Sequence, residues 1–303
     1  MRDPHDRYAH LSTEQPNPAS ENLDTLSPLE FIELAQLEDQ RVLEALEAVK
    51  DDLAELIGEL ARRFRAGGRL FYVGAGTSGR LGMLDATECP PTFGSDPLQV
   101  QAILAGGFEC LVRSVEGAED DDEAGKRAVR LRGVKKDDLV LGIAASSTTP
   151  FVVGALAEAG EIGAYTGLVT SHENPDLNFR PDKVVILSTG PEILTGSTRL
   201  KAGTAAKMFL NRLTTGAMVQ IGKVYQNRMV DLNLTCDKLR ERAIRTTRYF
   251  TDLSREEAIG LLEKVDGSVK MGILVHRTGL SPDEAMERLV RCDGQLRRAL
   301  EEN

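Results

Sequence analysis

Apolar residues follow two different periods along this chain, and the change of period divides it into segments. From Leu43 to Phe64 they recur every three or four residues, which predicts a long amphipathic helix. The helix is expected to begin at the capping box Ser27-Pro28-Leu29-Glu30 and to end at Gly67-Gly68. Beyond that point, short apolar runs alternate with helical stretches, so we expect strands and helices in turn.

Five apolar runs predict strands, and helical patterns separate them. A sheet whose strands alternate with helices is parallel and has helices packed on its faces, so we expect an α/β fold with a parallel five-stranded sheet in an αβα sandwich. The expected strands are Arg69–Val73, Leu98–Leu104, Leu139–Ile143, Ala164–Val169 and Lys183–Leu187. The expected helices include Arg80–Thr87, Asp122–Leu131, Phe151–Glu158 and Ala202–Ile221.

The two ends of the chain differ from this central part. Residues 1–26 are rich in Pro, Asn and Ser and predict an extended arm. Near the other end, the capping boxes Ser254–Glu257 and Ser281–Glu284 precede apolar stripes, which predicts a small three-helix subdomain. We therefore expect an N-terminal arm and helix at 1–50, an α/β domain at 51–235 and a helical subdomain at 236–303.

Charge and composition exclude several classes of partner. The 303 residues carry a formal net charge of −10, which argues against nucleic acid or an anionic membrane as the partner. No apolar run approaches the roughly 18 residues of a membrane span, and the first residues resemble no secretory signal, so we expect a cytoplasmic protein. The four cysteines, Cys89, Cys110, Cys236 and Cys292, show no C-x-x-C spacing, which favours reduced thiols without a metal site.

The segment Gly74-Ala75-Gly76-Thr77-Ser78-Gly79 has the glycine spacing of a dinucleotide-binding loop. Such a site also needs an acidic residue at the end of the second strand, but LQVQAILAGG ends there in glycines. A nucleotide cofactor is therefore disfavoured, and we predict no cofactor. A Gly/Thr/Ser turn at a helix N-terminus still suits another phosphate, because its backbone N–H groups are free.

Two further hydroxyl-rich segments follow predicted strands. Gly142–Pro150 contains Ser146, Thr148 and Thr149, and Thr195–Arg199 contains Ser197. One such segment alone is typical of a helix cap. Three of them would meet at the carboxyl edge of a parallel sheet, where open α/β sheets bind ligands, so together they favour a phosphosugar pocket.

Longer motifs carry a resemblance to a known family. The motifs VGAGTSGRLGMLDATECPPTFG, VEGAED and EILTGSTRLKAGTAAKMFLN resemble those of the N-acetylmuramic acid 6-phosphate etherases, a branch of the sugar isomerase (SIS) superfamily. The arm TEQPNPASENLDTLSPLEF is similar too, and the last helices resemble that family's ubiquitin-associated (UBA-like) tail. The resemblance implies an SIS phosphosugar-binding domain at 51–235. It implies cleavage of the lactyl ether, which gives D-lactate and N-acetylglucosamine 6-phosphate in cytoplasmic cell-wall recycling. It also implies a homodimer with sites near the subunit interface.

The implied chemistry needs an acid and a base. Opening the sugar to its aldehyde makes the proton on the neighbouring carbon acidic and places the lactyl oxygen on the beta carbon, where it can leave. Elimination of lactate followed by addition of water then puts a hydroxyl group in its place. Histidines are scarce, which makes two carboxylates the natural pair, one of them kept protonated by burial. The resemblance implies Glu88 as the proton donor to lactate and Glu119 as the base. It implies that the phosphate lies against Thr77, Ser78, Ser146, Thr148, Thr149 and Ser197.

Alternatives remain for these residues. Glu88 alone is typical of a surface acid at a helix end, and the run from Glu119 to Glu123 is typical of a solvated helix start. Lys201 either reaches the substrate or extends along the surface. At Ala145–Pro150 this chain departs from the family pattern Ala-Ser-Gly-Arg-Thr-Pro, because a glycine and an arginine are missing. This difference leaves the exact substrate and the rate open.

Two other functions are compatible with an SIS fold. An aldose–ketose isomerase also removes an alpha proton but expels no group, so it needs no acid such as Glu88. A non-catalytic phosphosugar-binding regulator is the second alternative, as in glucokinase regulatory protein, which has two such domains in tandem. This chain has room for one, which favours the enzyme.

Overall fold

The computed structural model describes residues 11–113, 115–146, 149–173, 175, 179–234 and 236–302. The chain divides into two compact units. The sheet unit comprises Met1–Ala86 and Leu98–Leu213, and the helical unit comprises Thr87–Pro97 and Thr214–Asn303. No helix in the described ranges is long and apolar enough to span a bilayer.

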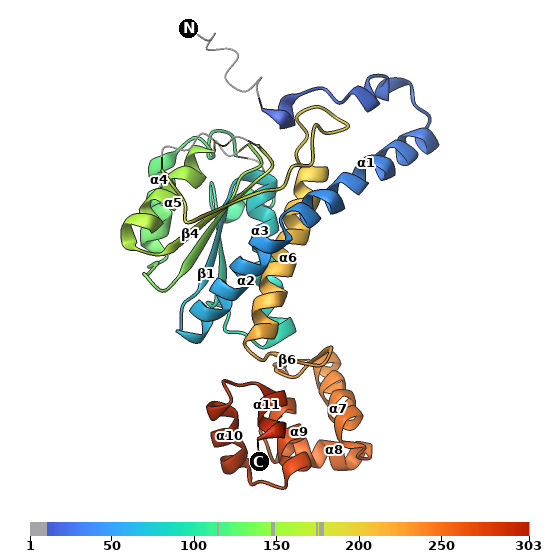
Figure 1. Cartoon of the computed structure of the whole chain (residues 1–303), viewed down its shortest axis with the longest axis vertical. Coiled ribbons are helices and arrows are strands. Elements are labelled where there is room, and N and C mark those ends of the chain that lie inside the picture. Colours follow the sequence, from blue (N-terminus) through green and yellow to red (C-terminus); the bar gives the residue numbers. More distant parts are fainter. Residues whose placement is uncertain are drawn as a thin grey trace. The chain divides into compact units, whose positions relative to one another are not determined.

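The sheet unit is built on five parallel strands in the order β2-β1-β3-β4-β5 (Figure 1). Their bounds are β1 (Leu70–Gly74), β2 (Val100–Leu104), β3 (Leu139–Ile143), β4 (Tyr165–Thr170) and β5 (Lys183–Ile186). In the register, Leu70 lies opposite both Val100 and Leu139. The order reverses between β1 and β3, and ligands of such sheets bind beyond the carboxyl ends of the strands at this switch point. The expected five-stranded parallel sheet is confirmed.

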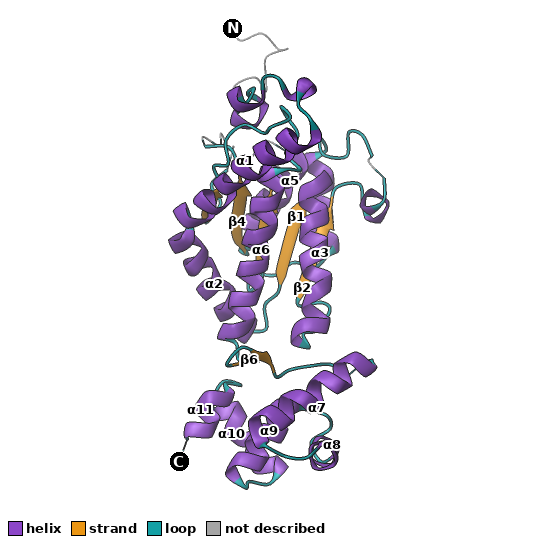
Figure 2. Cartoon of the chain, turned by 90° about the vertical axis from the view of Figure 1, so that its right-hand side faces the viewer, coloured by secondary structure: helices purple, strands orange, loops and turns teal. Residues whose placement is uncertain are grey.

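Helices cover both faces of the sheet, which explains why its strands are apolar without alternation. On one face lie α4 (Asp122–Leu131) and α5 (Pro150–Ile162), with Phe71 and Val73 of β1 in the core beneath them. The other face carries α2 (Lys50–Arg65), α3 (Gly76–Phe93) and α6 (Lys201–Gln220), as Figure 2 shows.

The helix predicted up to Gly67 is interrupted. The capping box at its start is confirmed, because the Ser27 backbone N–H donates to the Glu30 carboxylate at 2.8 Å and the Ser27 hydroxyl accepts from the Glu30 N–H. However, α1 (Pro28–Ala48) ends at Val49, whose backbone is not helical, and α2 begins at Lys50. Neither glycine nor proline marks this break, so the prediction of one continuous helix was wrong.

The helical unit holds more helices than the three expected. Its described residues form α7 (Asp237–Thr251), α8 (Arg255–Glu263), α9 (Val269–Thr278), α10 (Pro282–Arg291) and α11 (Leu296–Glu301), preceded by the hairpin β6 (Val224–Tyr225) and β7 (Arg228–Met229). The capping boxes at Ser254 and Ser281 are confirmed. One helix that was not expected is α9, which lies in the core of this unit and is buried from Val269 to Leu274, with Ser268 capping its start and Gly279 at its end. A helix buried on nearly all sides shows no amphipathic period.

Glycines allow α4 and α5 to pack closely. A Cβ atom on Gly125 of α4 would lie 2.0 Å from the carbonyl oxygen of Phe151, and one on Gly154 of α5 would lie 2.2 Å from that of Asp122. Both obstacles are backbone atoms, so no side-chain rotation can make room.

We expect Gly125→Ala to lower the free energy of unfolding by about 2 kcal/mol, because the two helices must move apart. The matched control is Gly58→Ala on α2, where no atom lies within 4 Å of the added methyl group. There the higher helix propensity of alanine should raise stability by about 0.5–1 kcal/mol. Urea denaturation of the full chain measures both, and effects of the same sign would contradict this account of the packing.

Candidate active site

The turn from β1 to α3 brings a helix N-terminus to the carboxyl edge of the sheet. Gly74 and Gly79 must be glycines, because a Cβ on Gly79 would lie 2.5 Å from the Gly74 oxygen and one on Gly74 would lie 2.6 Å from the Gly79 nitrogen. Gly76 has a φ of +52°, a region that favours glycine. The spacing thus serves a sharp turn and close helix–strand packing. The strand β2 ends at Leu104 with Ala105 and Gly106 following, so no acid stands where a ribose would need one.

The hydroxyl-rich segments meet at this edge, as the sequence predicts. Ser78 shares a small cavity with Ala145 after β3, Thr170 at the end of β4 and Thr198 before α6. Its volume of about 10 Å³ leaves room for a single water at most, so the segments are in close contact here. The Thr77 methyl group faces Gly203 of α6, where a Cβ would lie 3.5 Å from it.

A larger cavity of about 250 Å³ opens beside the first turn of α3. Gly76, Arg80, Cys110, Glu116 and Glu119 are among the residues that line it. Arg80 donates to the backbone oxygen of Leu111 at 3.3 Å and to that of Arg113 at 3.5 Å. Sequence reasoning missed Arg80, although a cation four residues after Gly76 on a helix is a usable signal for an anion site.

Glu119 is distinct from the acidic residues that follow it. The Asp121 carboxylate caps α4 by accepting from the Ala124 N–H at 2.7 Å, and Glu123 pairs with Lys126 at 2.6 Å. Those carboxylates therefore form a capped and solvated helix start. Glu119 instead lines the cavity, and its carbonyl oxygen accepts from the Phe151 N–H at 3.0 Å at the start of α5.

The hydroxyl-rich segment Gly142–Pro150, which follows β3, is described only in part. Ser147 and Thr148 lie outside the described residues, and Ser146 is half-buried. Thr149 is the N-cap residue of α5, yet its side chain makes no capping hydrogen bond. Helix capping thus does not explain this hydroxyl group. Ser197 is half-buried but does not line the cavity at Ser78, where its neighbour Thr198 takes that position.

Glu88 lies near the end of α3, ten residues after Ser78, and its side chain is exposed. The following residues are buried Cys89 and then Pro90 and Pro91, which are inside the helix. Glu88 lines neither of the two cavities described above. Glu119 is exposed as well, so the expected burial of one carboxylate is not met within one chain.

The N-terminal arm lies across the loops at the same edge. Its Ser12 hydroxyl donates to the Ser171 oxygen at 3.4 Å, and the Gly196 N–H donates to the Thr13 oxygen at 3.2 Å. The Asn17 amide donates to the Pro191 oxygen at 3.1 Å and to Glu38 at 2.8 Å. The arm thus fixes the loops that follow β4 and β5.

A buried charge cluster anchors the start of α6. The ammonium group of Lys201, 1% exposed, pairs with the Glu38 carboxylate, and Glu192, 0% exposed, accepts from the backbone N–H groups of Lys201 at 3.0 Å and Ala202 at 2.9 Å. Burial raises the pKa of Glu192, and those two hydrogen bonds oppose the rise. Lys201 therefore neither reaches a ligand nor extends along the surface. The N-terminus of α6 is already occupied by a carboxylate, whereas the first turns of α3 and α5 contain no acidic residue.

The sheet order and the hydroxyl-rich carboxyl edge are those of an SIS domain. Residues 52–159 match the family "Glucokinase regulatory protein N-terminal SIS domain". An N-acetylmuramic acid 6-phosphate etherase of Trichormus variabilis is 52% identical over 96% of this chain and 95% of its own length. Another from Geobacillus thermodenitrificans is 48% identical over 96% of this chain and 99% of its own. The chain belongs to the N-acetylmuramic acid 6-phosphate etherase family.

The buried ion pair leads to a stability prediction. Glu38→Gln keeps the shape of the side chain but leaves the Lys201 ammonium group buried without a counter-ion, so we expect the free energy of unfolding at pH 7 to fall by about 3 kcal/mol. The matched control is Glu47→Gln, which breaks the exposed pair with Lys50 and should change nothing measurable. A loss of the same size in both variants would contradict the role of burial.

The same pair predicts a pH dependence. Although burial alone would raise the pKa of Glu38, hydrogen bonds from Lys201, Asn17 and Arg41 hold it below its ordinary value. The pair therefore contributes fully above about pH 4.3, the ordinary value, and the contribution is lost as the pH falls through the lowered pKa. The stability difference between the unsubstituted chain and Glu38→Gln should shrink below about pH 4, as measured by denaturation at several pH values.

Proposed function

We propose that this chain cleaves the D-lactyl ether of N-acetylmuramic acid 6-phosphate, giving N-acetylglucosamine 6-phosphate and D-lactate. The observation that carries the proposal is the 52% identity to an etherase over 96% of the chain. The anion-binding end of α3 at the β1/β3 switch point suits the phosphate of such a substrate. In this proposal the reaction belongs to peptidoglycan recycling in the cytoplasm.

The reaction begins on the open aldehyde form of the sugar. A base removes the proton from the carbon alpha to the aldehyde, and the bond between the beta carbon and the lactyl oxygen breaks. An acid protonates that oxygen, so lactate leaves with its own oxygen atom. Water then adds to the double bond, with its oxygen on the beta carbon and a proton on the alpha carbon. Each proton transfer is worth about 10²–10⁴-fold in rate.

In this mechanism the phosphate binds at the first turn of α3, against Thr77 and Ser78. Thr149 supports this placement, because it is the N-cap residue of α5 but its hydroxyl group makes no capping hydrogen bond. Ser146, Thr148 and Ser197 complete the expected set. Arg80, at the cavity beside Gly76, adds a positive charge that compensates for the arginine missing from the segment Ala145–Pro150.

Glu119 is proposed as the base and Glu88 as the proton donor. Glu119 is favoured for its position in the cavity that Arg80 also lines. Glu88 must instead hold a proton at neutral pH, which requires an environment drier than its exposed position in one chain. A second subunit or the bound substrate would supply that environment.

A homodimer is therefore part of the proposal, and α1 supports it. This helix is buried through Val42 and Leu46, while its apolar residues Leu29, Ile32 and Leu43 are 65%, 49% and 58% exposed. Large apolar side chains gathered on an exposed helix surface are typical of a contact with another chain. A second copy of the chain is the partner that covers this face.

Isotope labelling tests the reaction and the two glutamates. With the proposed substrate in deuterated, oxygen-18-labelled water, we expect D-lactate without oxygen-18 and a sugar that carries both labels. Glu88→Gln should lower lactate release by at least about 10²-fold, and Glu119→Gln should also suppress deuterium exchange at the alpha carbon. The control Glu123→Gln, at the solvated helix start, should behave as the unsubstituted chain.

Other outcomes would favour the alternatives. A labelled sugar without lactate release points to an isomerase, and phosphosugar binding without turnover points to a regulator. Full activity of Glu88→Gln would overturn its role as the proton donor.

The dimer is tested by sedimentation. We expect the unsubstituted chain to sediment as a dimer and Leu29→Asp/Ile32→Asp to shift it toward monomer, because burying two carboxylates in an interface is unfavourable. Leu131→Asp on α4, where the leucine is 87% exposed, is the matched control and should leave the dimer intact. A monomeric unsubstituted chain with full activity would contradict the proposal.

A further inference from the structure

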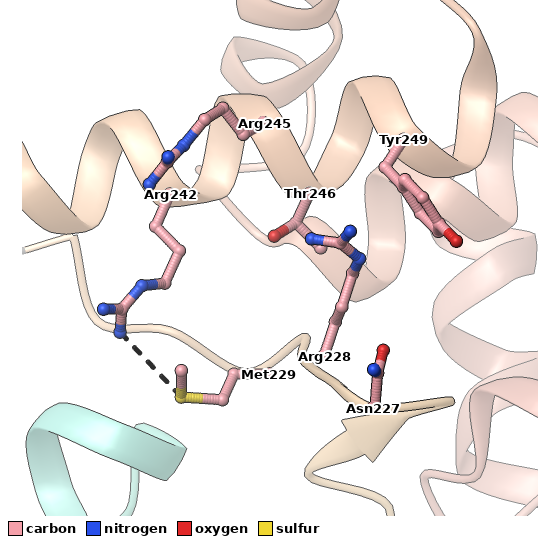
Figure 3. Close-up of a pocket in the computed structure, with 7 residues that line it drawn as sticks. All are labelled: Asn227, Arg228, Met229, Arg242, Arg245, Thr246 and Tyr249. Atoms are coloured by element: carbon pink, nitrogen blue, oxygen red, sulfur yellow. Dashed lines mark hydrogen bonds between the residues drawn. The ribbon is translucent and has the colours of Figure 1, made fainter.

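The helical unit contains a second pocket that none of the proposed catalytic steps uses. It lies between the hairpin β6–β7 and the helix α7, and its volume is about 480 Å³ (Figure 3). The volume is within the range of about 300–1,000 Å³ that is typical of small-molecule sites. The lining residues are Asn227, Arg228, Met229, Arg242, Arg245, Thr246 and Tyr249.

Local sequence explains why these side chains share one pocket. Arg242, Arg245, Thr246 and Tyr249 are spaced by three and four residues, so they lie on one side of α7. The hairpin turns through Gln226, whose φ is +52°, and this turn directs the following residues toward α7. Arg228 then places its guanidinium carbon 3.8 Å from the centre of the Tyr249 ring.

The pocket is positively charged, although the chain as a whole is acidic. Its lining contains three arginines and no carboxylate. Other arginines of this unit are paired, for example Arg255 with Glu241 and Arg291 with Glu302 at 3.2 Å. Within the described part of the chain, the three pocket arginines form no ion pair within 4.0 Å, although Glu241 attracts Arg245, and the Arg242 guanidinium donates to the Met229 sulfur at 4.0 Å.

A buried donor in the pocket lacks an acceptor. The Nε atom of Arg228 is inaccessible to solvent and has no hydrogen-bond partner among the described residues. A buried N–H group without an acceptor is destabilising, and charged donors are more so. Unpaired guanidinium groups also repel one another. An anionic ligand in the pocket would relieve this repulsion.

The geometry points to a binding site for small phosphate esters in this pocket. Figure 3 shows Arg242 and Arg245 toward one end, and Arg228 beside Tyr249 toward the other. A guanidinium group matches the oxygen geometry of a phosphate, so the phosphate binds at the Arg242–Arg245 end. The organic part lies along the Arg228–Tyr249 end, where Asn227 and Thr246 offer hydrogen bonds.

A single tryptophan can report on this pocket, because the chain contains none. Tyr249→Trp keeps an aromatic ring beneath Arg228 and makes the fluorescence of the full chain specific to the pocket. We expect saturable fluorescence changes with glucose 6-phosphate and AMP. Both should bind at least about 10-fold more tightly than inorganic phosphate, because the organic part adds contacts.

Charge-matched variants separate the pocket from general charge effects. When Arg242→Gln/Arg245→Gln is added to the Tyr249→Trp chain, binding of both esters should weaken by at least about 10-fold. Adding Arg240→Gln/Arg248→Gln removes the same charge from α7 outside the pocket and should change affinity less than about 2-fold. Equal weakening in the two double variants, or phosphate bound as tightly as the esters, would overturn the proposal.

Two further measurements keep the result independent of the proposed etherase. Adding Ser78→Ala should leave the tryptophan response unchanged, and loss of the response there would assign it to the α3 site and overturn the proposal. Calorimetry of the chain without the tryptophan should show one fewer ester bound per chain in Arg242→Gln/Arg245→Gln. An unchanged stoichiometry and affinity in that variant would also overturn it, whether or not the chain cleaves an ether.

Discussion

The ion pair between Lys201 and Glu38 joins segments that are far apart in the sequence. Glu38 belongs to α1 and also binds Asn17 of the arm, while Lys201 begins α6. Two buried charges are stable only when each has its partner, so these segments hold one relative position. The arm and the loop before α6 both border the carboxyl edge of the sheet, so the ion pair also fixes how these segments lie at that edge.

The same cluster determines where an anion can bind. The helices α3, α5 and α6 begin at this edge, and the first turn of a helix offers free backbone N–H groups in principle. At α6 the carboxylate of Glu192 already accepts two of these N–H groups. At α3 the first turn carries Thr77 and Ser78, and Arg80 follows beside the cavity. The fold thus closes the N-terminus of α6 and leaves that of α3 open for the proposed phosphate.

Local patterns predicted much of this structure. The bounds of β3 and α4 match their predicted ranges, and the capping boxes at Ser27, Ser254 and Ser281 are present. These features depend on residues that are near one another in the sequence. The break at Val49 escaped prediction because neither glycine nor proline marks it, and α9 escaped because a helix buried on nearly all sides shows no amphipathic period.

The candidate site was predictable in its parts but not in its assembly. The three hydroxyl-rich segments were found because each follows a strand, and parallel strands share an edge. The pairing of Lys201 with Glu38, 163 residues earlier, leaves no local trace. Thr198 lines the cavity in place of the expected Ser197, and which of these two neighbours does so depends on the exact turn of one loop. That the Thr149 side chain makes no capping hydrogen bond to α5 could be seen only in the structure.

The arm also has a consequence for the order of folding. Its contacts to the loops at the ligand edge span 159 residues for Ser12 and Ser171, and 174 residues for Asn17 and Pro191. Contacts of such long sequence separation form late, because closing a long loop has an entropic cost that only an existing scaffold offsets. The arm is therefore made well before the loops that hold it, and it reaches its final position only once those loops exist.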